Sequence, residues 1–191
     1  MKILKQHKLL HCINTNFFLF KNNILYLGLP SSEKVFELIL VELLLFIILD
    51  KDKSLSILIN SSSENHNYYQ AQYSHLNLIT CVDCINRNFN YVQTIVLGKG
   101  LGSIMYLLTT INKNKRCSFK NSTLSIESVP YYFYSKNDFT YKKNLIEAKK
   151  TLNTLYYLNN TYTTFNCVER DVNVIDATEA LRLGILDTIL I

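Results

Sequence analysis

The sequence predicts an α/β fold built on a parallel β-sheet. Short apolar runs rich in strand-forming residues recur along the chain, and helical patterns separate them. Consecutive strands joined through a helix run parallel, which defines this fold class. The chain has 191 residues, of which 48% are hydrophobic, enough for one domain with a substantial core. We expect that domain to cover residues 22–191, after an N-terminal segment at residues 1–21.

The first predicted strand is the apolar run Asn23–Leu29. Ser31 or Ser32 would cap the following helix, because serine side chains accept hydrogen bonds from the first helical N–H groups. The apolar pattern of this helix continues to about Leu49. After it we expect a second strand at residues 55–59 and a weakly patterned helix within residues 66–90.

The second half of the chain begins with a predicted strand at Tyr91–Leu97. A glycine-rich turn, Gly98–Gly102, then leads into a helix that ends near Thr110. The remaining expected elements are short strands at 117–119 and 123–126, a long amphipathic helix at 141–158 and a short helix at 177–183.

Charge and hydropathy argue against a nucleic-acid partner and a membrane span. The net charge of +5 is spread over scattered lysines, with no basic stripe interleaved with aromatics, so no nucleic-acid partner is expected. The segment Leu38–Leu49 is intensely apolar but contains Glu42 and is shorter than the roughly 20 residues that a membrane span needs. We therefore interpret it as a buried helix rather than a membrane anchor.

The five cysteines are an odd number and follow no recognisable secretory signal, which favours a reducing compartment. Cys81 and Cys84 have the C-x-x-C spacing of a redox motif or half of a zinc site. A zinc site would need two further ligands, and the chain has no second C-x-x-C. We expect neither a metal nor a cofactor.

Four segments in order resemble the proteolytic subunit of the Clp protease. They are Ile57–Ser61, Gly98–Leu108, Arg116–Ser122 and Glu179–Asp187, and the likeness runs from about residue 22 to residue 191. The resemblance implies the ClpP/crotonase-like fold, made of repeated ββα units, with residues 141–158 as a protruding handle helix. It also implies heptameric rings of homologous subunits around a chamber, polypeptide substrates, and an ATP-dependent unfoldase docked on the ring.

The same resemblance assigns a Ser-His-Asp triad to three positions of this chain. A serine hydroxyl needs an imidazole to take its proton and a carboxylate to orient that imidazole. Counting from Arg116, the family's serine falls on Gly102 and its histidine on Glu127. Counting back from Glu179, its aspartate falls on Val172 without a gap and on Asp171 with a one-residue insertion. The glycines of the family's oxyanion loop are replaced by the sequence Ser62-Ser63-Glu64. The catalytic set is therefore not intact.

Ser103 is the fallback nucleophile, one residue beyond the family's position. On a helix one residue is a rotation of about 100°, which would turn its hydroxyl away from the reacting position. We therefore interpret the chain as a non-catalytic ring subunit of the ClpR type. Such subunits occur in plastids, so we expect the apicoplast or chloroplast stroma.

Three alternatives stay open. The first is an active serine endopeptidase that uses Ser103. The second is a stand-alone ligand-binding protein on the crotonase-like fold, and the third is a membrane-bound subunit anchored by residues 38–49.

Overall fold

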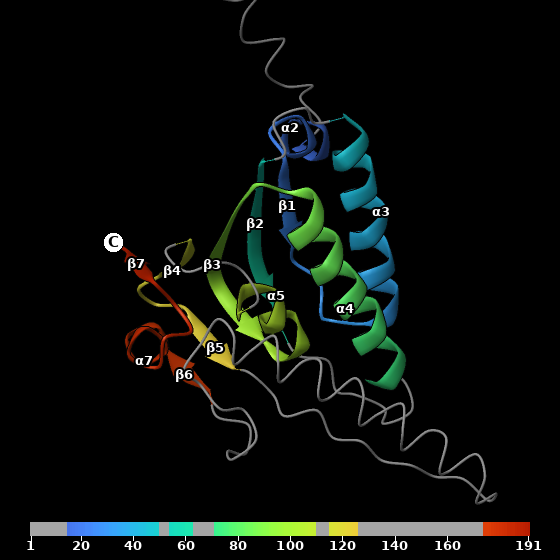
Figure 1. Cartoon of the computed structure of the whole chain (residues 1–191). Coiled ribbons are helices and arrows are strands. Elements are labelled where there is room, and N and C mark those ends of the chain that lie inside the picture. The colour runs from blue at the N-terminus through green and yellow to red at the C-terminus, as the bar shows by residue number, and fades with distance from the viewer. Residues whose placement is uncertain (1–14, 50–53, 63–70, 110–114, 126–173) are drawn as a thin grey trace, which may run out of the picture.

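A computed structural model gives the structure of the chain and describes residues 15–49, 54–62, 71–109, 115–125 and 174–191 (Figure 1). Its centre is a seven-stranded sheet in which β1, β2, β3, β4 and β7 are neighbours in that order. Each of these neighbouring pairs is parallel, as the sequence predicts. The elements of the first half are α2 (Thr15–Lys21), β1 (Ile24–Leu27), α3 (Glu33–Leu49), β2 (Ser54–Ser61), α4 (Ala71–Asn88) and β3 (Tyr91–Leu101).

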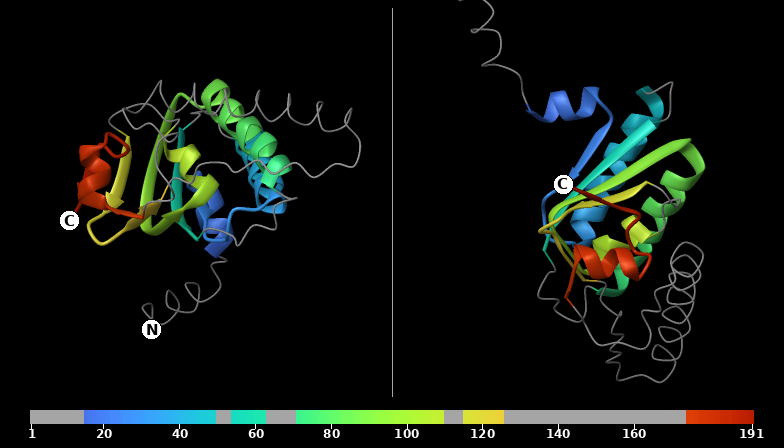
Figure 2. Two further views of the ribbon diagram at one scale, coloured as in Figure 1. Left: turned by 90° about the horizontal axis from the view of Figure 1, so that it is seen from below. Right: turned by 90° about the vertical axis from the view of Figure 1, so that its left-hand side faces the viewer.

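Helices α3 and α4 pack side by side against one face of the β1–β2–β3 sheet (Figures 1 and 2). Alternate strand residues point into this layer and are fully buried, among them Leu25, Ile57 and Val96. This alternation is the period of two expected of a strand. The start of α3 also follows the prediction, since the backbone N–H of Val35 donates to Oγ of Ser32 at 3.4 Å. The predicted strand–helix–strand order is confirmed over this part of the chain.

Only one face of α3 is buried, so the expectation of a buried helix is half right. Its inward face consists of Phe36, Ile39, Leu43 and Phe46. The outward face carries six large apolar side chains that are 43–76% exposed, namely Leu38, Val41, Leu44, Leu45, Ile48 and Leu49. No helix in the described part of the chain is long and apolar enough to cross a membrane.

Strand β3 is longer than predicted, because the glycine-rich segment continues the strand to Leu101. Gly100 pairs with Ser61 of β2, after a shift of register at the end of that strand. A Cβ atom on Gly100 would lie 2.6 Å from Sδ of Met105, so glycine serves here for close packing and not for a turn. The turn comes at Gly102, where φ is 80°.

The chain then forms a short 3₁₀ helix, η1 (Gly102–Ile104), and the buried helix α5 (Met105–Thr109). Strands β4 (Arg116–Phe119) and β5 (Thr123–Ser125) pair in succession along the same edge of β3. The last elements are β6 (Ile175–Asp176), α7 (Ala177–Arg182) and β7 (Thr188–Leu190), of which β6 pairs with β5 and β7 with β4. The side chain of Asp176 caps α7 by accepting the Glu179 N–H at 2.7 Å.

Helix α2 has no counterpart in the elements predicted from sequence. The ring of Phe20 on α2 stacks on that of Phe46 on α3, with centroids 4.9 Å apart. The boundary between residues 21 and 22 stays a prediction, and the predicted handle helix at residues 141–158 lies outside the described residues.

Candidate functional site

The candidate site lies at the carboxyl ends of β2 and β3, where parallel sheets commonly bind ligands. Three features meet there: the end of β2 at Ser61, the glycine-rich end of β3, and the buried helices η1 and α5 that follow. The hydroxyl of Ser61 donates to the carbonyl of Leu29 at 2.6 Å, which fixes the end of β2 beside the start of α3. The floor of the site is thus built from paired backbone.

Gly102 occupies the position that the family resemblance assigns to the nucleophile. It is buried, and its φ of 80° is in the left-handed region, which L-residues with a side chain rarely adopt. Glycine brings no hydroxyl, and a serine placed on this backbone would be strained. The local conformation thus fits glycine better than it fits the family's serine.

Ser103, the fallback nucleophile, is only 5% exposed within η1. Its hydroxyl therefore lies within the packed start of η1 and not on an open surface. That Ser103 does not replace the family's serine stays a prediction. Glu127, Asp171 and the sequence Ser63-Glu64 lie outside the described residues, and their assignment stays a prediction.

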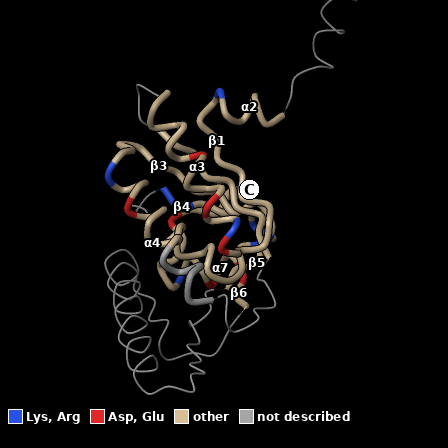
Figure 3. Tube along the Cα trace, turned by 90° about the vertical axis from the view of Figure 1, so that its right-hand side faces the viewer, with Lys and Arg blue, Asp and Glu red and all other residues tan. Residues whose placement is uncertain are grey.

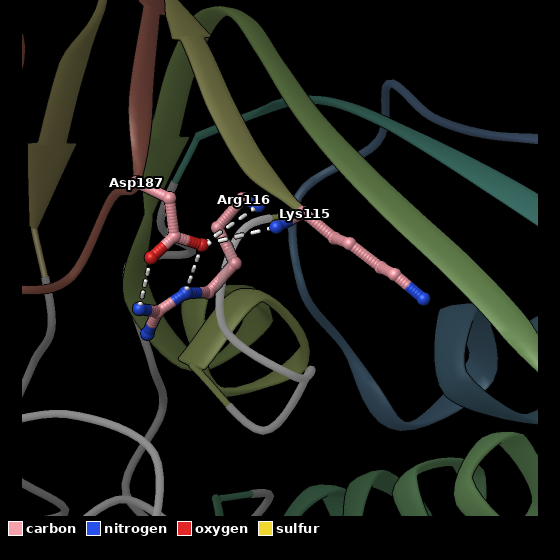
Figure 4. Close-up of polar contacts among 3 residues, drawn as sticks. All are labelled: Lys115, Arg116 and Asp187. Carbon is pink, nitrogen blue, oxygen red and sulfur yellow. Dashed lines mark hydrogen bonds and ion pairs between the residues drawn. The ribbon is translucent and has the colours of Figure 1, made fainter.

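A buried ion pair joins the start of β4 to the residue before β7 (Figure 4). Arg116 at the start of β4 donates to Asp187 through Nε at 2.9 Å and through Nη2 at 2.7 Å. The backbone N–H groups of Lys115 and Arg116 donate to the same carboxylate, each at 3.1 Å. Burial raises the pKa of Asp187, but the hydrogen bonds and the positive charge of Arg116 lower it by more. The net result is a pKa below the ordinary value of an aspartate.

The sequence marks Arg116 and Asp187 as landmarks of the resemblance but does not show that they pair. The Arg116 side chain is 1% exposed. Arginine is rarely buried without a carboxylate partner. An arginine at the start of a buried strand is therefore the signal in the sequence that could have led to a search for its partner. Because the two residues join β4 to the loop before β7, they hold the last strand in register.

The Cys81-x-x-Cys84 motif lies on α4 with Cys81 fully buried against α3. Its thiol donates to the carbonyl of Phe36 at 3.5 Å, and burial raises its pKa to about 12. A thiol so hard to deprotonate is a poor nucleophile and a poor metal ligand. Within the described residues, no group of three or more His, Cys, Asp or Glu side chains could hold a metal ion.

The basic and acidic residues of the described chain are interspersed along the trace, with no single-sign face in the view of Figure 3. This distribution gives no indication of a nucleic-acid surface.

Comparison with known proteins agrees with this geometry. The family model described as Clp protease matches residues 6–191. The chain is 28% identical, over 90% of its own length, to ATP-dependent Clp protease proteolytic subunit-related protein 4, chloroplastic, of Arabidopsis thaliana. It is 29% identical, over 56% of its length, to ATP-dependent Clp protease proteolytic subunit 1 of Cutibacterium acnes. The chain spans about half the length of these curated relatives, 57% and 46% respectively.

Two solved structures share the fold. One, described as an enzyme, superposes with a TM-score of 0.76 at 25% identity, covering 91% of this chain and 98% of its own. The other, described as a peptidase from Plasmodium falciparum, has a TM-score of 0.72 at 23% identity with the same coverage of both chains.

Proposed function

Because this chain belongs to the Clp protease family, we propose that it is a non-catalytic ring subunit of the ClpR type, which assembles with active proteolytic subunits. The observation that carries the proposal is Gly102, a residue without a hydroxyl at the position that the resemblance assigns to the nucleophile, on a backbone conformation suited to glycine. Without a hydroxyl at that position, the acyl-enzyme step of a serine peptidase has no attacking atom. The contribution of this subunit is then structural.

The sequence position of Glu127 supports the same conclusion. A serine peptidase needs a neutral imidazole to accept the hydroxyl proton, and the resemblance puts a carboxylate where that imidazole would stand. The name of the chloroplastic relative, a proteolytic subunit-related protein, supports a subunit of this kind and a plastid location.

The outward face of α3 supports assembly with other subunits. Its six exposed apolar side chains lie on a single helix, whereas soluble monomers rarely expose a contiguous apolar patch of more than a few hundred Å². Burying such a face against a neighbouring subunit gains about 25 cal/mol for each Å² removed from water. We infer that heptameric rings with homologous subunits cover this face, and that an ATP-dependent unfoldase delivers polypeptides to them.

Co-expression with an active Clp subunit tests assembly. A tag on this chain should recover both chains in one complex of ring mass, determined by native mass spectrometry. Leu45→Gln and Ile48→Gln together should weaken the complex, since they make the exposed face polar without touching the core. Glu37→Gln, an exposed substitution on the same helix, is the matched control and should leave assembly unchanged. Recovery of this chain alone would contradict the ring role.

Labelling with a fluorophosphonate tests inactivity. In the mixed complex the label should appear on the active subunit only, and the purified chain should not hydrolyse a fluorogenic peptide. Label on this chain that Ser103→Ala removes would instead support the serine endopeptidase alternative.

A further inference from the structure

A polar hollow of about 550 Å³ lies at the carboxyl ends of β2 and β3, where the turn between β4 and β5 approaches them. Its described lining consists of Asn60, Ser62, Gly98, Lys99, Asn121 and Thr123. Neither Gly102, Ser103 nor the C-x-x-C motif lines it, but Ser62 does, the first residue of the segment that the resemblance assigns to the oxyanion loop. The hollow is therefore the polar part of the candidate site.

The lining offers hydrogen-bond donors and one positive charge. Lys99 carries the charge, while asparagine, serine and threonine side chains supply neutral donors. Oδ1 of Asn60 accepts the backbone N–H of Lys99 at 3.2 Å, which leaves the Nδ2 group of that amide as the donor. Among the described lining residues there is no Asp or Glu. This donor set is complementary to an anionic oxygen.

The floor of the hollow is held in place by backbone pairing. Lys99 pairs with Thr123 of β5 on one side, and the next residue, Gly100, pairs with Ser61 of β2 on the other. These pairs fix the positions of Lys99 and Thr123, two of the residues whose side chains line the hollow. Gly98 keeps the space open, because a Cβ atom there would come within 3.1 Å of Oδ1 of Asn60.

We propose that this hollow binds the carboxylate of an acidic residue in a polypeptide, with Lys99 as its charged contact. The proposal rests on the proposed function, which brings unfolded polypeptide to this subunit. A free small acid fits the geometry less well, because Asn60, Lys99, Asn121 and Thr123 are all exposed and could not enclose it as ligand pockets do. The side-chain carboxylate of a polypeptide needs no such enclosure, because the rest of the polypeptide can contact the protein elsewhere.

Fluorescence anisotropy with the purified full chain tests the site directly. The probe is a labelled, C-terminally amidated peptide with a Glu-rich centre, and its control has Gln at the same positions. The Glu peptide should bind more tightly, and 0.5 M salt should weaken it, as screening of an exposed charge requires. Equal binding of both peptides, or tighter binding of a version with a free C-terminus only, would overturn the proposal.

Variants identify the charged contact. Lys99→Met should weaken binding of the Glu peptide about two- to fivefold, the range of an exposed ion pair. Lys120→Met is the matched control, because Lys120 is also exposed but does not line the hollow, and should change nothing. Glu64 follows two residues after Ser62 in the sequence, and Glu64→Gln should strengthen binding or leave it unchanged. Equal losses from Lys99→Met and Lys120→Met would overturn the assignment.

Two further outcomes separate the claims. Free glutarate that competes with the peptide at equal molar affinity would overturn the choice of a polypeptide. The assay needs no other subunit, so a chain that binds the Glu peptide but fails to co-purify with active Clp subunits would refute the ring role alone.

Discussion

Replacing Asp187 by alanine should destabilise the chain by about 3–5 kcal/mol, the cost of removing one member of a buried ion pair. The Arg116 guanidinium is 1% exposed, so water cannot take the place of the lost carboxylate. The substitution also removes the acceptor of two backbone N–H groups, those of Lys115 and Arg116. At roughly 2–4 °C for each kcal/mol in a chain of this size, the midpoint of thermal unfolding should fall by about 6–20 °C.

Urea denaturation followed by far-UV circular dichroism and tyrosine fluorescence would measure this loss, since the chain has 13 Tyr and no Trp. Arg182→Met is the matched control. It removes an exposed pair, in which Arg182 and Glu179 side chains are 76% and 41% exposed, and should cost at most about 1 kcal/mol. The double variant Arg116→Met with Asp187→Leu should cost less than Asp187→Ala alone, because no buried charge remains. A loss from Asp187→Ala no larger than that from Arg182→Met would refute the reasoning.

Three further predictions concern the same region and α4. Gly102→Ser should destabilise the chain by roughly 1–2 kcal/mol, because serine must adopt the positive φ, and should restore no peptide hydrolysis, because no imidazole stands at position 127; measurable turnover would contradict that second reason. Iodoacetamide at pH 8 should alkylate Cys84 before Cys81, as peptide mapping by mass spectrometry would report, since Cys81 is fully buried with a pKa of about 12. The pKa of Asp187 is lowered in the folded chain, so its stabilisation is complete above its unfolded pKa of about 3.9 and is lost as the pH falls through the folded value. Asp187→Asn should therefore flatten the pH dependence of stability below about pH 4, and an unchanged acid transition would show that other groups control it.

The sequence predicts the first half of the fold because its signals are local. Strand β1 and helix α3 follow from an apolar run and a serine cap, and both appear close to the predicted bounds. The sequence predicts a turn at Gly98–Gly102, but Gly98 and Gly100 continue β3, and a Cβ atom on Gly100 would lie 2.6 Å from Sδ of Met105. Strand β7 could not be predicted, because its three residues become a strand only by pairing with β4, about 70 positions earlier.

The candidate site also has one part that the sequence predicts and one part that it does not. The sequence predicts that a helix begins near Gly102, and η1 begins there. The roles that counting from Arg116 assigns to Gly102 and Ser103 stay predictions. The hollow around Lys99 could not be predicted, because its lining comes from three separate segments that only the sheet brings together.

The pairing of β7 with β4 also has a consequence for biosynthesis. Residues 117–119 leave the ribosome long before residues 188–190 exist to pair with them. At 5–20 residues per second, the delay for some 70 residues is about 4–14 s. During that interval a nascent chain exposes an open strand edge, the kind of surface that invites aggregation. Efficient production of this polypeptide should therefore depend on a chaperone that shields the growing chain until β7 has been synthesised.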